Sequence, residues 1–257
     1  MPEDAWLYVW LAVAAFAAGV VNSIAGGGTL LTFPSLLTVV SPVVANGTST
    51  VALVPGSLSA VWGFRRDLAA IRRWIPLLVP PSIVGGVLGS LLVTRLEQRF
   101  FNALVPWLIL TAALLFLLQP ILARQANPGE RRAPKSRTLA AVVVAQFFVA
   151  VYGGYFGAGI GILMLSALGL MGMSDIHAMN CLKNLLAACI NGVSVLVFAA
   201  EGVVRWDLAA VMAPSAIVGA YAGSRLAQRI DRRLVRGLVV AIGFALAAHY
   251  FYQRWKS

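Results

Sequence analysis

Long apolar segments separated by short basic loops dominate this sequence. Most of the segments reach the roughly 20 residues that a helix needs to cross the roughly 30 Å hydrocarbon core of a bilayer. The second and the seventh are too short to do so comfortably. The pattern predicts an all-α, polytopic integral membrane protein. The ten segments are Trp6–Ala25, Thr29–Val44, Gly47–Phe64, Trp74–Val93, Asn102–Leu122, Thr138–Phe156, Ile160–Gly172, Ala178–Ala200, Leu208–Ser224 and Val235–Phe251.

The composition agrees with a chain whose main solvent is lipid. Of the 257 residues, 60% are hydrophobic and 11% are charged, whereas soluble domains contain about 25% charged residues. The net charge of +11 comes from Arg and Lys clusters at 65–73, 124–137 and 225–236. Such clusters between apolar segments are typical of cytoplasmic loops, so we expect a lipid bilayer as partner and no nucleic acid.

Each of the two short segments follows a glycine cluster. Gly26-Gly27-Gly28 precedes Thr29, and a cluster from Gly153 to Gly161 surrounds the start of the seventh segment. Isolated glycines let membrane helices pack closely, but consecutive glycines weaken a helix by about 1 kcal/mol each. The clusters therefore favour two helices that are broken inside the membrane, a feature of transporter binding sites.

The chain also repeats itself. An offset of 134 residues aligns the segment around Pro80 with that around Pro214, and an offset of 133 aligns Gly26 with Gly159. We predict a first transmembrane repeat at 1–123, a cytoplasmic linker at 124–137 and a second repeat at 138–257. A unit of about five segments used twice predicts that the second repeat is inverted, with both termini outside and all three basic loops inside.

The broken helices provide the candidate substrate site. A helix that restarts after a break presents free N–H groups and the positive end of its dipole, which attract anions. The helices after each break add polar side chains and, at Lys183, a charge. The candidate substrate-binding residues are Asn22, Gly26, Gly27, Gly28, Thr29, Thr48, Ser49, Tyr155, Gly157, Gly159, Lys183, Asn184 and Asn191.

Lys183 lies inside the segment Ala178–Ala200. A charged residue within a spanning helix costs at least about 2.5–3.5 kcal/mol on insertion scales, so it is expected to be functional. Two interpretations stay open: the amine faces an anion, or it extends toward the headgroups.

The acidic residues all fall in loops or at segment ends, so a carboxylate relay for cations has no residues to use. His177 is the candidate for proton coupling. Neither of the two histidines has a partner at metal-ligand spacing, so we expect no metal and no cofactor. Hydrolase motifs such as Gly-x-Ser-x-Gly are absent from the sequence, and we expect no enzyme.

The run from Gly19 to Leu31, followed by Pro34-Ser35-Leu36-Leu37, and the second run Gly154-Tyr155-Phe156-Gly157-Ala158-Gly159 resemble the paired motifs of the TauE/SafE family of sulfite exporters. Ala45-Asn46-Gly47-Thr48-Ser49 and the stretch from Lys183 to Asn191 resemble the helices that follow them. A longer glycine run often stands in that family where this chain has Gly28-Thr29. The resemblance implies a permease of the bacterial inner membrane.

The expected function, which the resemblance implies, is export of a small sulfur oxyanion, such as sulfite or an organosulfonate like sulfoacetate. Proton-coupled uptake of a sulfur compound and a non-transporting membrane assembly subunit are the alternatives. A homo-oligomer also stays open.

Overall fold

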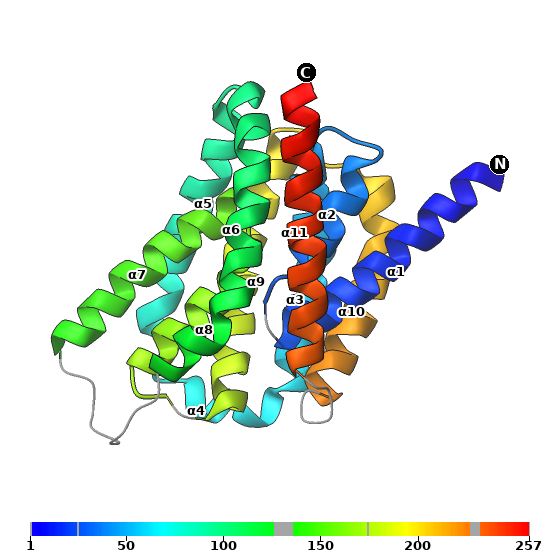
Figure 1. The fold of residues 1–257 in the computed structure, drawn as a ribbon. Helices are drawn as coiled ribbons and strands as arrows, with labels where there is room; N and C mark the ends of the chain where they lie inside the picture. Colours follow the sequence, from blue (N-terminus) through cyan, green and yellow to red (C-terminus); the bar gives the residue numbers. More distant parts are fainter. Residues whose placement is uncertain (1, 25, 126–135, 174, 227–231, 257) are drawn as a thin grey trace.

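The computed structural model describes residues 2–24, 26–125, 136–173, 175–226 and 232–256. Within these ranges the secondary structure is helical, as predicted, and no strand occurs (Figure 1). Most of the predicted linker at 124–137 lies outside the described residues. The elements are α1 (Pro2–Ile24), α2 (Thr29–Leu37), α3 (Pro42–Gly63), the 3-10 helix η1 (Arg65–Asp67), α4 (Leu68–Ile71), α5 (Ile75–Arg95), α6 (Gln98–Gln125), α7 (Ser136–Tyr155), α8 (Ile160–Leu170), α9 (Ile176–Ala200), α10 (Trp206–Leu226) and α11 (Arg232–Lys256).

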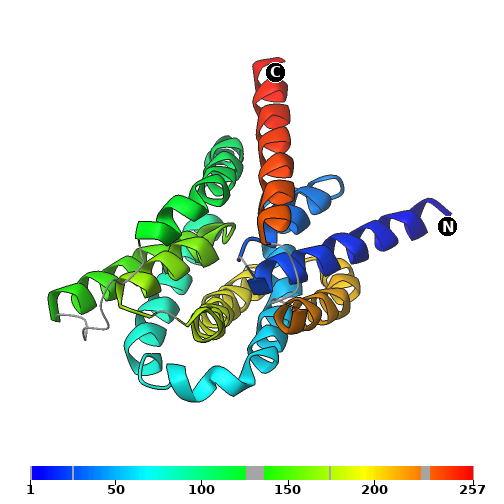
Figure 2. The same ribbon diagram turned by 60° about the horizontal axis from the view of Figure 1, so that its bottom comes forward.

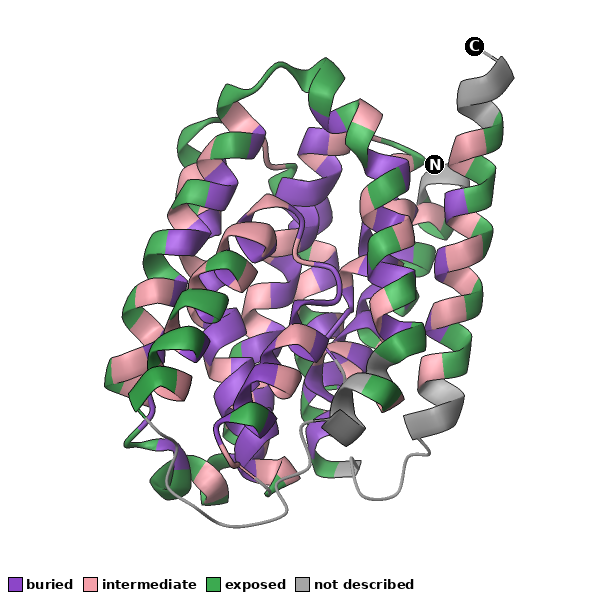
Figure 3. Ribbon diagram, turned by 60° about the vertical axis from the view of Figure 1, so that its left-hand side comes forward, coloured by how far each residue is buried: buried purple, intermediate pink, exposed green. Residues whose placement is uncertain are grey.

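The outer surface of the helix bundle is apolar. Five of the described helices, α1, α5, α6, α7 and α9, are long and apolar enough to cross a bilayer. Large hydrophobic side chains such as Trp6, Phe148 and Leu196 point outward and are more than 60% exposed. Figure 3 shows that the buried residues gather inside the bundle while exposed ones cover its outside. Because water would make so much exposed apolar surface unfavourable, the bundle surface is suited to lipid.

All ten predicted segments are present as helices, but one boundary was wrong. The segment predicted at Thr29–Val44 ends at Leu37, and the next helix begins at Pro42 and not at Gly47. Pro42 occupies the first helical position after Ser41, where its fixed φ and missing N–H cost nothing. The first basic loop also contains η1 and α4, which the hydropathy pattern did not indicate.

The helices of the two halves pack across each other. α1 packs along α10 and α5 packs along α7, on either side of the contacting pair α3 and α9 (Figure 2). Matched glycines make both side contacts close. A Cβ on Gly85 or Gly89 of α5 would lie within 3.0 Å of the α7 backbone, and one on Gly219 or Gly223 of α10 would do the same to α1. The offset between these glycine pairs is the predicted 134 residues.

The chain termini and the first basic loop lie at opposite ends of the molecule. Both chain termini lie at one end of the molecule, and η1 and α4 lie at the other, next to the ends of α6, α7, α10 and α11 that flank the other two basic loops (Figure 1). α2 turns back toward the end from which α1 comes, and α8 turns back toward the end from which α7 comes. The two broken helix pairs therefore reach the middle of the bundle from opposite ends of the molecule.

Gly219→Leu should separate α1 from α10. The new side chain would meet the Phe16 carbonyl oxygen, a backbone atom that cannot rotate away, so we expect a loss of at least about 1–3 kcal/mol of stability. Thermal unfolding in detergent would measure it. Gly237→Leu on α11, where a Cβ meets nothing within 4 Å, serves as the control and should unfold near the wild-type temperature.

Candidate functional site at the crossing of two broken helices

Each long helix before a break ends at a glycine in the left-handed region. Gly26 has φ of 74° and Gly157 has φ of 79°, values that favour glycine because it has no Cβ. The two N–H groups bond five residues back, from Gly26 to the Val21 carbonyl at 3.1 Å and from Gly157 to the Tyr152 carbonyl at 3.3 Å. The structure therefore aligns Gly26 with Gly157, two residues away from the sequence alignment of Gly26 with Gly159.

The two breaks touch each other. A Cβ on Gly26 would lie within 3.0 Å of the Gly161 Cα atom, and one on Gly157 would lie 3.7 Å from the Thr29 Oγ1 atom. The ring of Phe116 from α6 fills the space beside Gly27. The first turns of α2 and α8 are thus brought together with the ends of α1 and α7.

Lys183 of α9 contacts the end of α1. Its side chain is 1% exposed, and its Nζ donates to the carbonyl oxygens of Asn22 at 2.9 Å and of Ser23 at 3.0 Å. Asn184 Nδ2 donates to the same Ser23 oxygen at 3.2 Å. The interpretation of Lys183 as a headgroup-directed lysine is therefore wrong, because the ammonium is held inside the bundle by the open end of a broken helix.

Asn46 of α3 makes the corresponding contact in the other half. Its Nδ2 donates to the Tyr155 carbonyl oxygen at 3.0 Å, at the end of α7. The Tyr155 ring packs edge-on against Phe101 with ring centroids 5.5 Å apart. Tyr152 stabilises the same break internally, because its hydroxyl donates to the Ala158 carbonyl at 2.8 Å. Each half therefore provides the donor that satisfies the helix end of the other half.

These donors change the electrostatics at the contact between the breaks around Gly26 and Gly161, which we call the crossing. A helix C-terminus carries roughly −0.5 and an N-terminus roughly +0.5 of an elementary charge. Lys183 and Asn46 satisfy carbonyls at the negative ends of α1 and α7. The residues before α2 and α8 are Gly28 and Gly159, which provide no side-chain cap. The crossing therefore contains two uncapped positive helix ends and a buried ammonium, the kind of environment in which proteins bind anions.

The other predicted residues lie away from the contact between the breaks. Thr48 Oγ1 accepts from the Arg205 backbone N–H at 3.0 Å, in the connection between α9 and α10. Ser49 shares a hydrogen bond with Thr32 of α2, and Asn191 is half-buried two turns along α9 from Asn184. Thr32 Oγ1 also donates to the Gly28 carbonyl oxygen at 3.4 Å, so Ser49 is linked to the first break through Thr32.

His177 lies at the first turn of α9, six residues before Lys183 and therefore about 9 Å away along the helix axis. Its backbone N–H donates to Asp175 Oδ1 at 2.9 Å, and its ring lies 6.1 Å from that of Phe64. Burial, followed by the carboxylate of Asp175, raises the pKa of Asp67 in η1, and His177 opposes the shift. This titratable cluster is at the end of the molecule that carries the basic loops.

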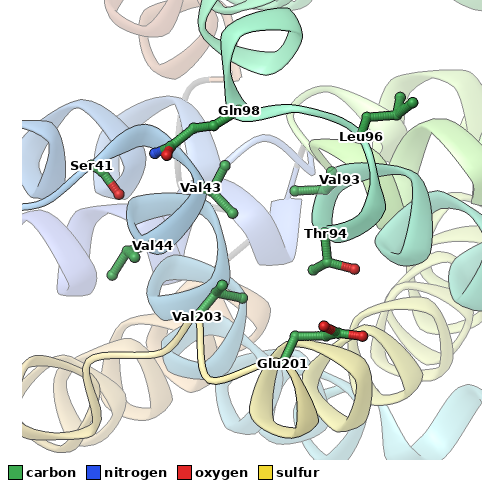
Figure 4. Close-up of a pocket in the computed structure, with 9 residues that line it drawn as sticks. All are labelled: Ser41, Val43, Val44, Val93, Thr94, Leu96, Gln98, Glu201 and Val203. Atoms are coloured by element: carbon green, nitrogen blue, oxygen red, sulfur yellow. The ribbon is translucent and has the colours of Figure 1, made fainter.

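A pocket of about 270 Å³ opens at the opposite end of the molecule (Figure 4). None of the predicted site residues lines it. Val93 at its wall is one helical turn above Gly89, and a Cβ on Gly89 would touch the Tyr155 backbone nitrogen. Glu201 lines the pocket and pairs with Arg95 at 2.9 Å. The pocket therefore lies beside the part of α5 that packs against the end of α7. Its lining residues are Ser41, Val43, Val44, Val93, Thr94, Leu96, Gln98, Glu201 and Val203.

The predicted site residues left out three contributors to the crossing. Asn46 stood in a run that resembles a helix of the family but was not assigned to the site. Ser57, whose Oγ accepts from Asn22 Nδ2 at 3.2 Å, was a polar residue within an apolar helix, a signal too common in membrane proteins to select it. Phe116 gave no signal, because an aromatic residue in a spanning helix is ordinary.

Two broken helix pairs that meet inside an apolar helical bundle define a membrane transporter of the broken-helix class. The comparisons with known proteins give the family: the family Sulfite exporter TauE/SafE matches residues 11–250. The chain belongs to this family, and it is a multi-pass bacterial membrane protein.

Similar proteins from other bacteria are also described as probable membrane transporters. The chain is 32% identical to a probable membrane transporter protein of Haemophilus influenzae, with 93% of each chain covered. It is 32% identical to the probable membrane transporter protein ORF9 of a Sinorhizobium species, covering 94% of this chain and 91% of that one. Identity to YfcA of Escherichia coli K12, a probable membrane transporter protein, is 30%, covering 93% and 87%. No solved structure matches the chain significantly.

Proposed function

We propose that this chain exports a small sulfur oxyanion, sulfite or an organosulfonate such as sulfoacetate, across the bacterial inner membrane. The observation that carries the proposal is the contact between the two breaks at Gly26 and Gly161. It brings two uncapped helix N-termini together beside a buried lysine. The description of the family as sulfite exporters supports the choice of a sulfur oxyanion.

The charges favour an anion over a cation. The acidic side chains that the structure describes lie at helix ends or in connections, namely at Asp67, Glu97, Asp175, Glu201 and Asp207. Among the described residues, the only side-chain charge at the crossing is that of Lys183. An anion leaving a cell with an inside-negative membrane potential gains about 2.3 kcal/mol per charge per 100 mV, so export needs no coupling ion.

Electrical recording on protein-containing liposomes tests the proposal. Purified protein would be challenged in turn with sulfite, sulfoacetate, sulfate and chloride, with empty liposomes as the leak control. We expect a current with sulfite or sulfoacetate that reverses with the gradient and is small with chloride. Equal currents with all four anions would contradict a sulfur-specific exporter.

Proton-coupled uptake is the second candidate, and the cluster of Asp67, Asp175 and His177 at the cytoplasmic end is what favours it. It requires that a pH gradient alone drives accumulation of the sulfur compound. Loss of that accumulation in His177→Gln would decide for uptake, provided that the current driven by an anion gradient at equal pH on both sides stays at the wild-type level.

A further inference from the structure

Helix α9 carries two buried amides that each have at least one polar atom without a hydrogen-bond partner. Asn180 is 0% exposed, and neither its Nδ2 nor its Oδ1 makes a hydrogen bond; Asn184 Oδ1 is also unpartnered. Asn46 Oδ1 is the one other such side-chain atom among the described residues. Because a buried amide without a partner costs free energy, it indicates a water molecule or ligand that completes its hydrogen bonds.

The unpartnered amides share one face with Lys183. Asn180, Lys183 and Asn184 are spaced by three and four residues, which places them on the same side of a helix. Lys183 and Asn184 both donate to carbonyls at the end of α1. Asn180 follows one turn closer to the cytoplasmic end. The amides therefore extend the anion-favouring crossing toward the cytoplasm.

The direction of one hydrogen bond fixes the chemistry that the pair requires. Asn184 Nδ2 donates to the Ser23 carbonyl, and exchanging its nitrogen and oxygen would place two oxygens against each other. Asn184 Oδ1 is therefore an acceptor that needs a donor from outside. Asn180 offers one further acceptor and a donor NH₂ group in either orientation. A single ligand that binds both amides and leaves neither without a partner therefore both accepts and donates hydrogen bonds.

The adjacent ammonium of Lys183 adds a requirement for negative charge. A fully ionised oxyanion has only acceptors, and so does a simple sulfonate. An oxyanion that retains one proton has acceptor oxygens, one O–H donor and a single negative charge. Hydrogensulfite meets all these requirements.

We propose that Asn180 and Asn184 form a substrate-binding pair that takes a small oxyanion in its monoprotonated form. For sulfite this form is hydrogensulfite. The inference rests on the proposed function, because it takes the crossing as the substrate site. It adds Asn180 to that site and gives the protonation state that is carried.

The wild-type protein provides the first test. Thermal stabilisation in detergent by sodium sulfite would be measured over a series of pH values that spans the second dissociation of the acid, with sodium methanesulfonate in parallel. We expect the apparent affinity to follow the concentration of hydrogensulfite and methanesulfonate to bind about tenfold more weakly, the loss for one missing hydrogen bond to a charged ligand. Affinity that follows the dianion would overturn the inference and leave sulfite export intact. An absence of binding by both compounds would count against the proposed function as well.

A matched pair of variants provides the second test. Asn180→Leu removes an unpartnered buried amide, whereas Gln146→Leu removes a buried amide whose Nε2 donates to Ser82 Oγ at 2.8 Å. We expect Asn180→Leu to unfold at or above the wild-type temperature but to bind sulfite about tenfold more weakly. Gln146→Leu should unfold at a lower temperature with unchanged affinity. A wild-type affinity for sulfite in Asn180→Leu would overturn the inference, because it would show that the Asn180 amide is satisfied by water or by Asn184 and does not bind the substrate. If that variant does not fold, the wild-type pH series decides.

Discussion

Gly26→Ala is expected to abolish transport and to lower the free energy of unfolding by about 2–5 kcal/mol. A left-handed backbone at a residue with a Cβ accounts for roughly 1–2 kcal/mol, and overpacking accounts for roughly 1–3 kcal/mol. Gly26 has φ of 74°, and its added Cβ would lie within 3.0 Å of the Gly161 Cα. Because that atom belongs to the backbone, the two breaks must move apart. Chemical unfolding in detergent and anion flux in liposomes measure the two effects.

Gly192→Ala is the control for this substitution. Gly192 lies within α9, and a Cβ there meets nothing within 4 Å. Alanine favours a helix over glycine by roughly 0.5–1 kcal/mol, so this variant should be as stable as the wild type or slightly more stable, and should transport normally. Wild-type stability and flux in Gly26→Ala would show that the two breaks do not touch.

Lys183→Met is expected to reduce anion flux by about 100-fold while the protein still folds. Hydrogen bonds to charged groups contribute about 1.5–3 kcal/mol, and a loss near 2.7 kcal/mol corresponds to that factor. Two opposing effects on stability explain why folding survives. The Asn22 carbonyl loses its lysine donor, but the bundle no longer buries an ammonium, and apolar replacements of buried charges are often neutral. The liposome current with sulfite gives the measurement.

Arg72→Met removes a positive charge at an exposed position at the end of the molecule that carries the basic loops. It should leave the current almost unchanged, because an exposed charge is screened by solvent and salt. A sulfite current in Lys183→Met equal to that of Arg72→Met would mean that the lysine only holds the end of α1 and that the anion binds elsewhere.

The breaks were predictable because local chemistry determines them. Thr29 and Ile160 begin their helices at the residues that the sequence indicated, since the preceding glycines interrupt a helix whatever surrounds them. The end of α2 was less predictable. Apolar residues continue through the turn before Pro42, and hydropathy does not distinguish a buried turn from a helix.

The candidate site was only partly predictable. Lys183 could be selected because a charge within an apolar segment is costly wherever the segment lies. Its partners, the carbonyls of Asn22 and Ser23, could not, because backbone groups are the same at every residue. Asn46 and Tyr155 are 109 residues apart, and no local pattern indicates that they meet. The unpartnered state of Asn180 is likewise visible only when its surroundings are known.

Apolar length, glycine clusters and the distribution of arginines by themselves determined that this chain is a helical membrane protein with two broken helices and its basic loops on one side. These properties follow from the interaction of each segment with lipid, water and its own backbone, so they depend on nearby residues alone. Only the tertiary structure decided that each half satisfies the open helix end of the other, and that Gly26 corresponds to Gly157. Those outcomes depend on which distant surfaces can approach closely, and that is determined by the packing of all the helices together.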